Sequence, residues 1–246
     1  MDDKENIVVG KVFFRKMVAV LGVVYDGPHK YGDFKWMLKQ PEYEDTLFVY
    51  NDNVKDNLDP NSMDGAGSAA IRNVSWRFAT PPRSVGIPTG WSVASGGFDE
   101  MDIYSKRAID FSIARIWKII MDSDSKVTKV IYSCSREDKM KIGVSIFQPH
   151  SSILNYINDQ LHNLQSAYAR SPIHLLNFSF VSNTHDDLDA LEKSELLPIV
   201  TIHDKHGRAQ QQIRILQREL EETKMSKRRR AMTQYPVTLA SKYPWV

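Results

Sequence analysis

Thr46-Leu-Phe-Val-Tyr50 is a short apolar run that stops abruptly at the polar triplet Asn51, Asp52 and Asn53. A continuous apolar run of this length, bounded by turn-forming residues, is typical of a β-strand buried on both faces. Asn and Asp suit the end of such a strand because their side chains hydrogen-bond to nearby backbone amides. Strands buried on both faces belong mainly to parallel sheets, so this run predicts an α/β fold.

The segments after this strand alternate between strand and helix patterns. Strands are predicted at residues 85–87 and 127–133, and amphipathic helices at residues 102–120 and 151–164. This alternation predicts a mixed, largely parallel sheet flanked by helices.

The two ends of the chain add further elements. Residues 7–25 are rich in β-branched and aromatic side chains and predict an N-terminal β-hairpin. Residues 175–181 and 197–202 predict strands, and residues 203–234 predict one long polar helix. We expect a single α/β domain over residues 1–203.

Residues 204–246 are expected to form a C-terminal helix and an extended tail outside that domain. Within this helix, Ile213, Leu216 and Leu220 form a narrow apolar strip at helical spacing. Such a strip favours a protein partner or self-association through residues 207–230, and hence a homo-oligomer.

The length, composition and net charge of the chain limit the class of protein. The chain has 246 residues, 42% hydrophobic and 25% charged, as in ordinary globular proteins. A formal net charge of +2 does not favour nucleic acid, although the basic run at residues 227–230 leaves that partner open. One cysteine, Cys134, fits a reducing compartment, and no run of roughly 18 apolar residues predicts a membrane helix. We expect a cytoplasmic protein with no membrane partner.

A glycine-rich loop after the central strand suggests a ligand site. Gly65-Ala-Gly67-Ser68-Ala-Ala-Ile-Arg72 packs small residues densely enough for backbone to approach a ligand closely. If Ser68 begins a helix, its free N–H groups make an anion site, and Arg72 one turn later could hold a phosphate. The turn Pro88-Thr89-Gly90 follows the next strand, where ligands of open α/β sheets bind.

These motifs resemble a family of small phage and bacterial α/β proteins of uncharacterised activity, over residues 42–166. The family carries a strand ending in Gly/Asn-Asp-Asn, a Gly-Gly-x-Ala-x-x-Arg loop and a Gly-Ile-Pro-Thr turn. A second glycine loop of the family corresponds to residues 133–145, where only Gly143 remains as glycine. The style of the motifs is also similar to macrodomain-like ADP-ribose binders and to phage proteins that sequester nucleotide signals.

The residues and the resemblance together imply a nucleotide-type pocket without a metal ion or a cofactor. The candidate ligand-binding residues are Asn51, Asp52, Asn53, Gly65, Gly67, Ser68, Arg72, Pro88, Thr89, Gly90, Ser133, Ser135 and Gly143. Each motif also has a structural explanation that the sequence leaves open. The polar triplet could satisfy its own backbone, the glycines could serve tight packing, and Arg72 could pair with an acid.

Three functions follow from these features. The first is a protein that binds a nucleotide or an ADP-ribose-like molecule without turnover, as a phage-encoded host-defence antagonist would by ligand capture in the host cytoplasm. The second is a hydrolase of a phosphoester or ADP-ribose-like bond, with Asp52 as candidate catalytic residue orienting water and Arg72 holding phosphate charge. The third is a phage-encoded interaction or structural protein that acts through its basic C-terminal helix.

Overall fold

The computed structural model of the protein describes residues 18–122, 124–144, 147–166 and 185–234. Its β-strands are β1 (Ala19–Val23), β2 (Thr46–Asp52), β3 (Ser84–Pro88), β4 (Gly90–Ser92), β5 (Gly96–Gly97) and β6 (Lys129–Ser133). Its α-helices are α1 (Phe34–Met37), α2 (Val54–Leu58), α3 (Val74–Arg77), α4 (Ile103–Met121), α5 (Ser151–Ser166) and α6 (His185–Gln234). Two short 3₁₀-helices, η1 (Pro41–Tyr43) and η2 (Gly67–Ile71), complete the described elements.

Four of the strands form one parallel sheet in the order β1-β6-β2-β3. All three neighbouring pairs are parallel, which confirms the predicted α/β fold with a largely parallel sheet. The strand that comes last in sequence, β6, lies between β1 and β2. The carboxyl ends of β1, β6 and β2 therefore meet side by side at one edge of the sheet.

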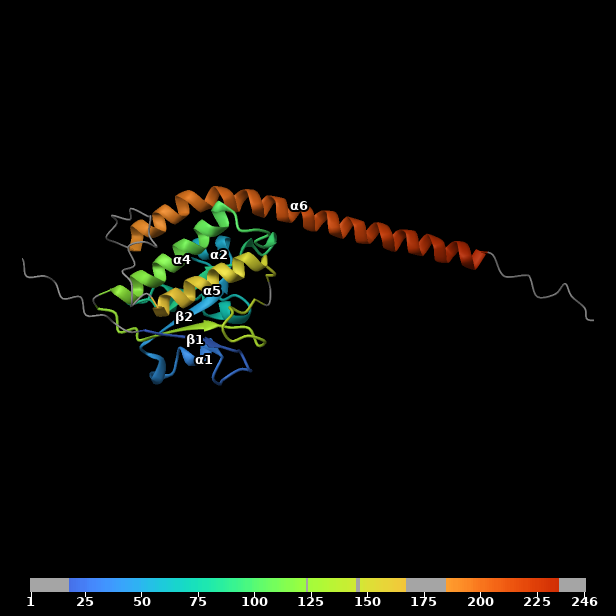
Figure 1. Ribbon diagram of the computed structural model, residues 1–246. Helices are drawn as coiled ribbons and strands as arrows, with labels where there is room; N and C mark the ends of the chain where they lie inside the picture. The colour runs from blue at the N-terminus through green and yellow to red at the C-terminus, as the bar shows by residue number, and fades with distance from the viewer. Residues whose placement is uncertain (1–17, 123, 145–146, 167–184, 235–246) are drawn as a thin grey trace, which may run out of the picture.

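Alternation along β2 divides its side chains between the two faces of the sheet. Leu47 and Val49 join the apolar cluster made with α4, α5 and α6. Phe48 and Tyr50 join a smaller cluster made with α1 and η2. Figure 1 shows α4, α5 and α6 on one side of the sheet and α1 on the other. The strand is thus buried on both faces, as its continuous apolar run predicts.

The helix expected at residues 102–120 is α4, which lies across β3 and the centre of the sheet. Asp102 caps it by accepting hydrogen bonds from the backbone N–H groups of Tyr104 and Ser105, and Ser105 Oγ accepts one from the Asp102 N–H. This reciprocal arrangement satisfies N–H groups that a helix start leaves unpaired.

The strand predicted at residues 197–202 is wrong, because these residues belong to α6, a helix of 50 residues. Its buried side chains recur every four residues, at Glu192, Leu196, Val200 and Asp204. That spacing places them on one helical face against the body of the protein. An apolar, β-branched segment can satisfy either pattern, and packing against α4 and α2 selects the helix.

The second half of α6 leaves the body of the protein. Every residue from 208 to 226 is exposed, and Figure 1 shows the helix projecting well past the sheet. The domain boundary expected after residue 203 therefore falls inside one continuous helix. No helix in the described part of the chain is both long and apolar enough to cross a membrane.

Some expected elements lie outside the described residues. β1 corresponds to the second strand of the predicted hairpin, whereas residues 7–14 cannot be assigned because residues 1–17 are not described. The strand predicted at residues 175–181 and the tail at residues 235–246 also lie outside the described ranges.

Candidate functional site

A cleft of about 1340 Å³ lies beyond the carboxyl ends of β1, β6 and β2. Tyr25 enters it just after β1, Asn51 lines it near the end of β2, and Ser133 lines it at the end of β6. Ligands of open α/β sheets bind at this edge, where neighbouring strands are not consecutive in sequence. Pockets for small molecules measure roughly 300–1,000 Å³, so this cleft is large enough for such a ligand.

Asn51 connects three of the segments that the sequence singles out. Its backbone N–H donates to Ser68 Oγ at 3.3 Å, and its Nδ2 donates to the Gly143 carbonyl at 3.5 Å. Its Oδ1 accepts a hydrogen bond from Thr89 Oγ1 at 2.8 Å. The glycine loop, the turn after β3 and the loop after β6 thus converge on the end of β2.

Most of the predicted ligand-binding residues line this cleft, but not all of them. The lining includes Asn51, Asn53, Gly65, Gly67, Ser68, Arg72, Ser133, Ser135 and Gly143. Asp52, Pro88, Thr89 and Gly90 are buried and lie outside the lining. The turn after β3 therefore supports the cleft through Thr89 and does not face it.

Arg72 and Asp52 form a buried ion pair with each other. Arg72 Nε donates to Asp52 Oδ2 at 3.2 Å, and its Nη2 donates to Asp52 Oδ1. The remaining nitrogen, Nη1, lies 3.0 Å from Asp56 Oδ2 and donates to Ser62 Oγ at 3.2 Å. Each nitrogen of the guanidinium has a partner within the protein. This is the acid-paired alternative that the sequence leaves open for Arg72.

Burial and the pairing itself act in opposite directions on the pKa of each group. Burial raises the pKa of the Asp52 carboxyl to about 6, although Arg72 and the Asn53 N–H both act to lower it. Burial also acts to lower the pKa of Arg72, but its contacts with Asp52 and Asp56 outweigh that effect and raise it. At neutral pH the two groups are held as a charged pair shielded from solvent.

The polar triplet and the glycine loop have local structural roles as well. Asn53 caps α2, because its Oδ1 accepts the Asp56 N–H at 3.0 Å. The helix expected to begin at Ser68 is η2, a 3₁₀-helix of five residues that starts at Gly67 and has no side-chain cap. So short a helix has only a weak dipole, which adds little to an anion site at its N-terminus.

Several basic and aromatic residues that sequence reasoning missed also line the cleft. Lys35, Trp36 and Lys39 come from α1 and the turn after it, and Arg136 and Lys141 come from the loop after β6. Lys39 and Lys141 are both exposed. The signal available in the sequence was the density of charge at residues 136–141, directly after a predicted strand end. α1 offers no comparable signal, because a helix of four residues is too short to show a helical pattern in the sequence.

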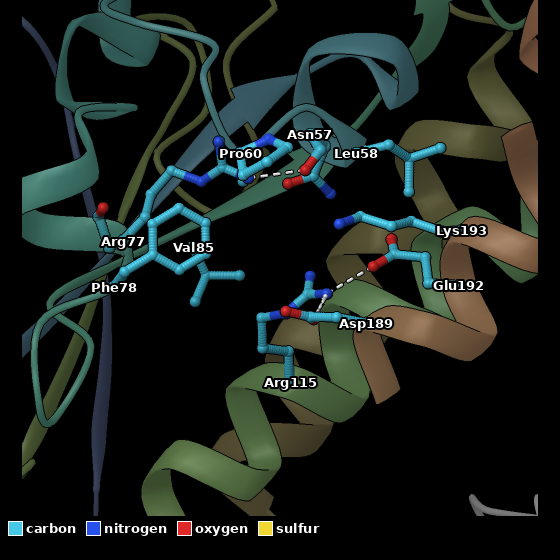
Figure 2. Close-up of a pocket in the computed structure, with 12 residues that line it drawn as sticks. Asn57, Leu58, Pro60, Arg77, Phe78, Val85, Arg115, Asp189, Glu192 and Lys193 are labelled. Atoms are coloured by element: carbon cyan, nitrogen blue, oxygen red, sulfur yellow. Dashed lines mark hydrogen bonds and ion pairs between the residues drawn. The ribbon is translucent and has the colours of Figure 1, made fainter. Parts of the chain in front are cut away.

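A second, much smaller cavity of about 60 Å³ lies where α6 docks beside β3. Figure 2 shows Arg115 reaching between Asp189 and Glu192, with Lys193 extending toward the cavity. Arg115 contacts Asp189 Oδ1 at 2.6 Å and Glu192 Oε2 at 2.5 Å. This volume suits a few water molecules and is too small for a nucleotide, so the cavity belongs to the docking of α6.

Comparison of the chain with protein-family models, with curated proteins and with solved structures gave no match. The family resemblance of the motifs therefore stays a prediction, and the cleft itself is the feature that points to a function.

Proposed function

We propose that the protein binds a small molecule of the nucleotide or ADP-ribose class in the cleft at the ends of β1, β6 and β2. The position and size of this cleft carry the proposal. It lies at the edge of a parallel sheet where such ligands bind, and its volume is large enough to admit a ligand of this class.

The chemistry of the lining supports this ligand class. Lys39 and Lys141 offer exposed ammonium groups that can neutralise phosphates as point charges. Trp36 is half-buried and gives a flat apolar ring on which a base can stack. Ser68 and Ser135 add hydroxyl groups that can hydrogen-bond to ribose or phosphate oxygens.

Three of the four carboxylates in or beside the cleft, all except Glu137 on the exposed loop after β6, favour binding without turnover over hydrolysis. Asp52 is paired with Arg72 and does not line the cleft. Asp56 lines it but accepts contacts from Arg72 and from Asn53 Nδ2. Asp33 lines it but accepts the backbone N–H groups that begin α1. These three groups are committed to structure, which leaves them poorly placed to activate a water molecule. On this view the protein captures its ligand, as a phage-encoded antagonist of host defence would.

Native mass spectrometry of the purified protein tests the proposal, combined with a thermal-shift screen of ADP-ribose, NAD and cyclic nucleotides. We expect a bound small molecule of this class, or a rise in melting temperature with at least one of the three. Incubation of the same ligand with the protein should return it unchanged. A ligand that is consumed would favour the hydrolase, and the absence of both a bound molecule and a shift would contradict the proposal.

A further inference from the structure

From Ile202 onward, α6 carries an apolar seam that nothing in the described part of the chain covers. The seam residues are Ile202, Ala209, Ile213, Leu216 and Leu220. Ile213, Leu216 and Leu220 are 53%, 56% and 55% exposed, and Ile202 is 65% exposed. A helical segment that contacts no other part of the fold is normally polar on all sides.

The spacing of the seam is that of a coiled coil. Assigning Ile213 to position a of a heptad places Leu216 at d and Leu220 at the next a. The same register continues backward through Ala209 and Ile202, both at d, with the polar His206 at the intervening a position. The a and d positions thus extend over about three heptads. A seven-residue repeat is the period that winds two helices around each other.

The seam also lies on the correct side of the helix for a partner. At 3.6 residues per turn, the seam residues fall within about 60° of one another on the helix surface. The buried side chains Leu196, Val200 and Asp204, which dock α6 on the body, lie on the opposite half of the helix. A second helix can therefore run along the seam without displacing α6 from its own domain.

Charges beside the seam indicate which helix would pair with it. In a parallel pair, position g of one helix faces position e of the next heptad of its partner. For two copies of this chain, that rule places Glu219 against Lys224, Gln212 against Gln217, and Lys205 against Gln210. One of these contacts joins opposite charges and none joins like charges. The sequence is thus complementary to a second copy of itself in parallel.

We propose that two copies of the chain associate through a parallel coiled coil along residues 202–223 of α6. The first half of α6 docks on the body and so nucleates the helix. The projecting half then extends an existing helix and needs only a partner for its apolar seam. This interface is separate from the cleft, and the inference does not depend on ligand binding. A parallel pair places both α/β bodies at the same end of the coiled coil.

Sedimentation velocity of the full chain over a range of concentrations tests the seam, with two lysine variants as a matched pair. Leu216→Lys places a charge in the seam, whereas Ile215→Lys changes a neighbour that is 57% exposed on another face. Both positions are exposed in the single chain, so both variants should fold. We expect a dimer whose dissociation constant rises on the order of a hundredfold in Leu216→Lys, and changes less than about threefold in Ile215→Lys.

A monomer at all concentrations would overturn the proposal, as would equal weakening by the two variants. Orientation is tested by Thr223→Cys and Met225→Cys, since the single native cysteine, Cys134, is buried. Thr223 occupies position d, where a parallel pair brings Cα atoms within the ~4.4–6.8 Å that a disulfide spans. We expect oxidation to cross-link Thr223→Cys and not Met225→Cys. No cross-link in the Thr223→Cys dimer would contradict the parallel arrangement.

Discussion

Arg72 holds Asp52 through a two-pronged ion pair directly beneath the cleft, with Nε on Oδ2 and Nη2 on Oδ1. The Asp52 residue is 0% exposed and Arg72 is 6% exposed. Asp52 ends β2, and Arg72 follows η2, so the pair ties the glycine loop to the end of the central strand. Arg72, a predicted ligand-binding residue that lines the cleft, thus also stabilises the floor of the cleft through Asp52.

Arg72→Ala should therefore destabilise the fold strongly. It leaves the Asp52 carboxylate buried without its partner, which typically costs about 3–5 kcal/mol. The double variant Asp52→Leu/Arg72→Leu should recover much of this loss, because it leaves no unpaired charge. Urea unfolding followed by circular dichroism measures both. An Arg72→Ala protein with the wild-type urea midpoint would show that the Arg72–Asp52 ion pair contributes nothing to stability.

The docking of α6 on the body should depend on the buried carboxylate of Glu192 more than on the partly exposed carboxylate of Glu195. Glu192 is buried against Arg115, whereas Glu195 pairs with Arg107 at a partly exposed site. We expect Glu192→Ala to cost about 2 kcal/mol in unfolding free energy, and Glu195→Ala to cost less than about 1 kcal/mol. Chemical denaturation of the two variants side by side checks this order. A larger cost for Glu195→Ala would refute it.

Asp204 should link stability to pH in the acidic range. Burial acts to raise the pKa of Asp204, but hydrogen bonds from Lys55 and Ser92 outweigh it and hold the pKa below its ordinary value of 3.8. A carboxylate whose pKa is lower in the folded state stabilises the fold above 3.8, and this contribution is lost as pH falls through the folded pKa.

Asp204→Asn should therefore be less stable than the wild type at pH 7, by about 1 kcal/mol. The difference should shrink when unfolding is measured near pH 3, because the wild-type carboxyl is then becoming protonated. A difference that stays constant between the two pH values would mean that the charge of Asp204 is not what stabilises the helix.

Local patterns explain which elements the sequence predicts. The continuous apolar run of β2 and the helical stripe of α4 need no knowledge of distant residues. The glycine of the Gly-Ile-Pro motif has instead a tertiary reason, because a Cβ on Gly86 would lie 2.6 Å from Asp52 Oδ2 and 3.0 Å from the Tyr50 ring on the neighbouring strand. That motif serves packing against β2.

Other features of the fold and the cleft depend on tertiary contacts, which a sequence pattern does not show. Nothing near Arg72 in the sequence identifies Asp52, 20 residues away, as its partner. The apolar segment at residues 197–202 becomes helical because only one of its faces meets α4 and α2. Lys39 joins the cleft only because α1 folds back under the end of β2, beside η2.

Isothermal titration of the protein with the nucleotide that gives the largest thermal shift, carried out on two lysine variants, tests the cleft most directly. Lys141 lines the cleft at the carboxyl end of the sheet, whereas Lys126 is an exposed lysine just before β6, at the opposite end. We expect Lys141→Ala to weaken binding about tenfold, as the loss of one charged phosphate contact does. Lys126→Ala should bind as the wild type does. Equal affinities of Lys141→Ala and Lys126→Ala, or no heat of binding with any of these nucleotides, would contradict a nucleotide site in this cleft.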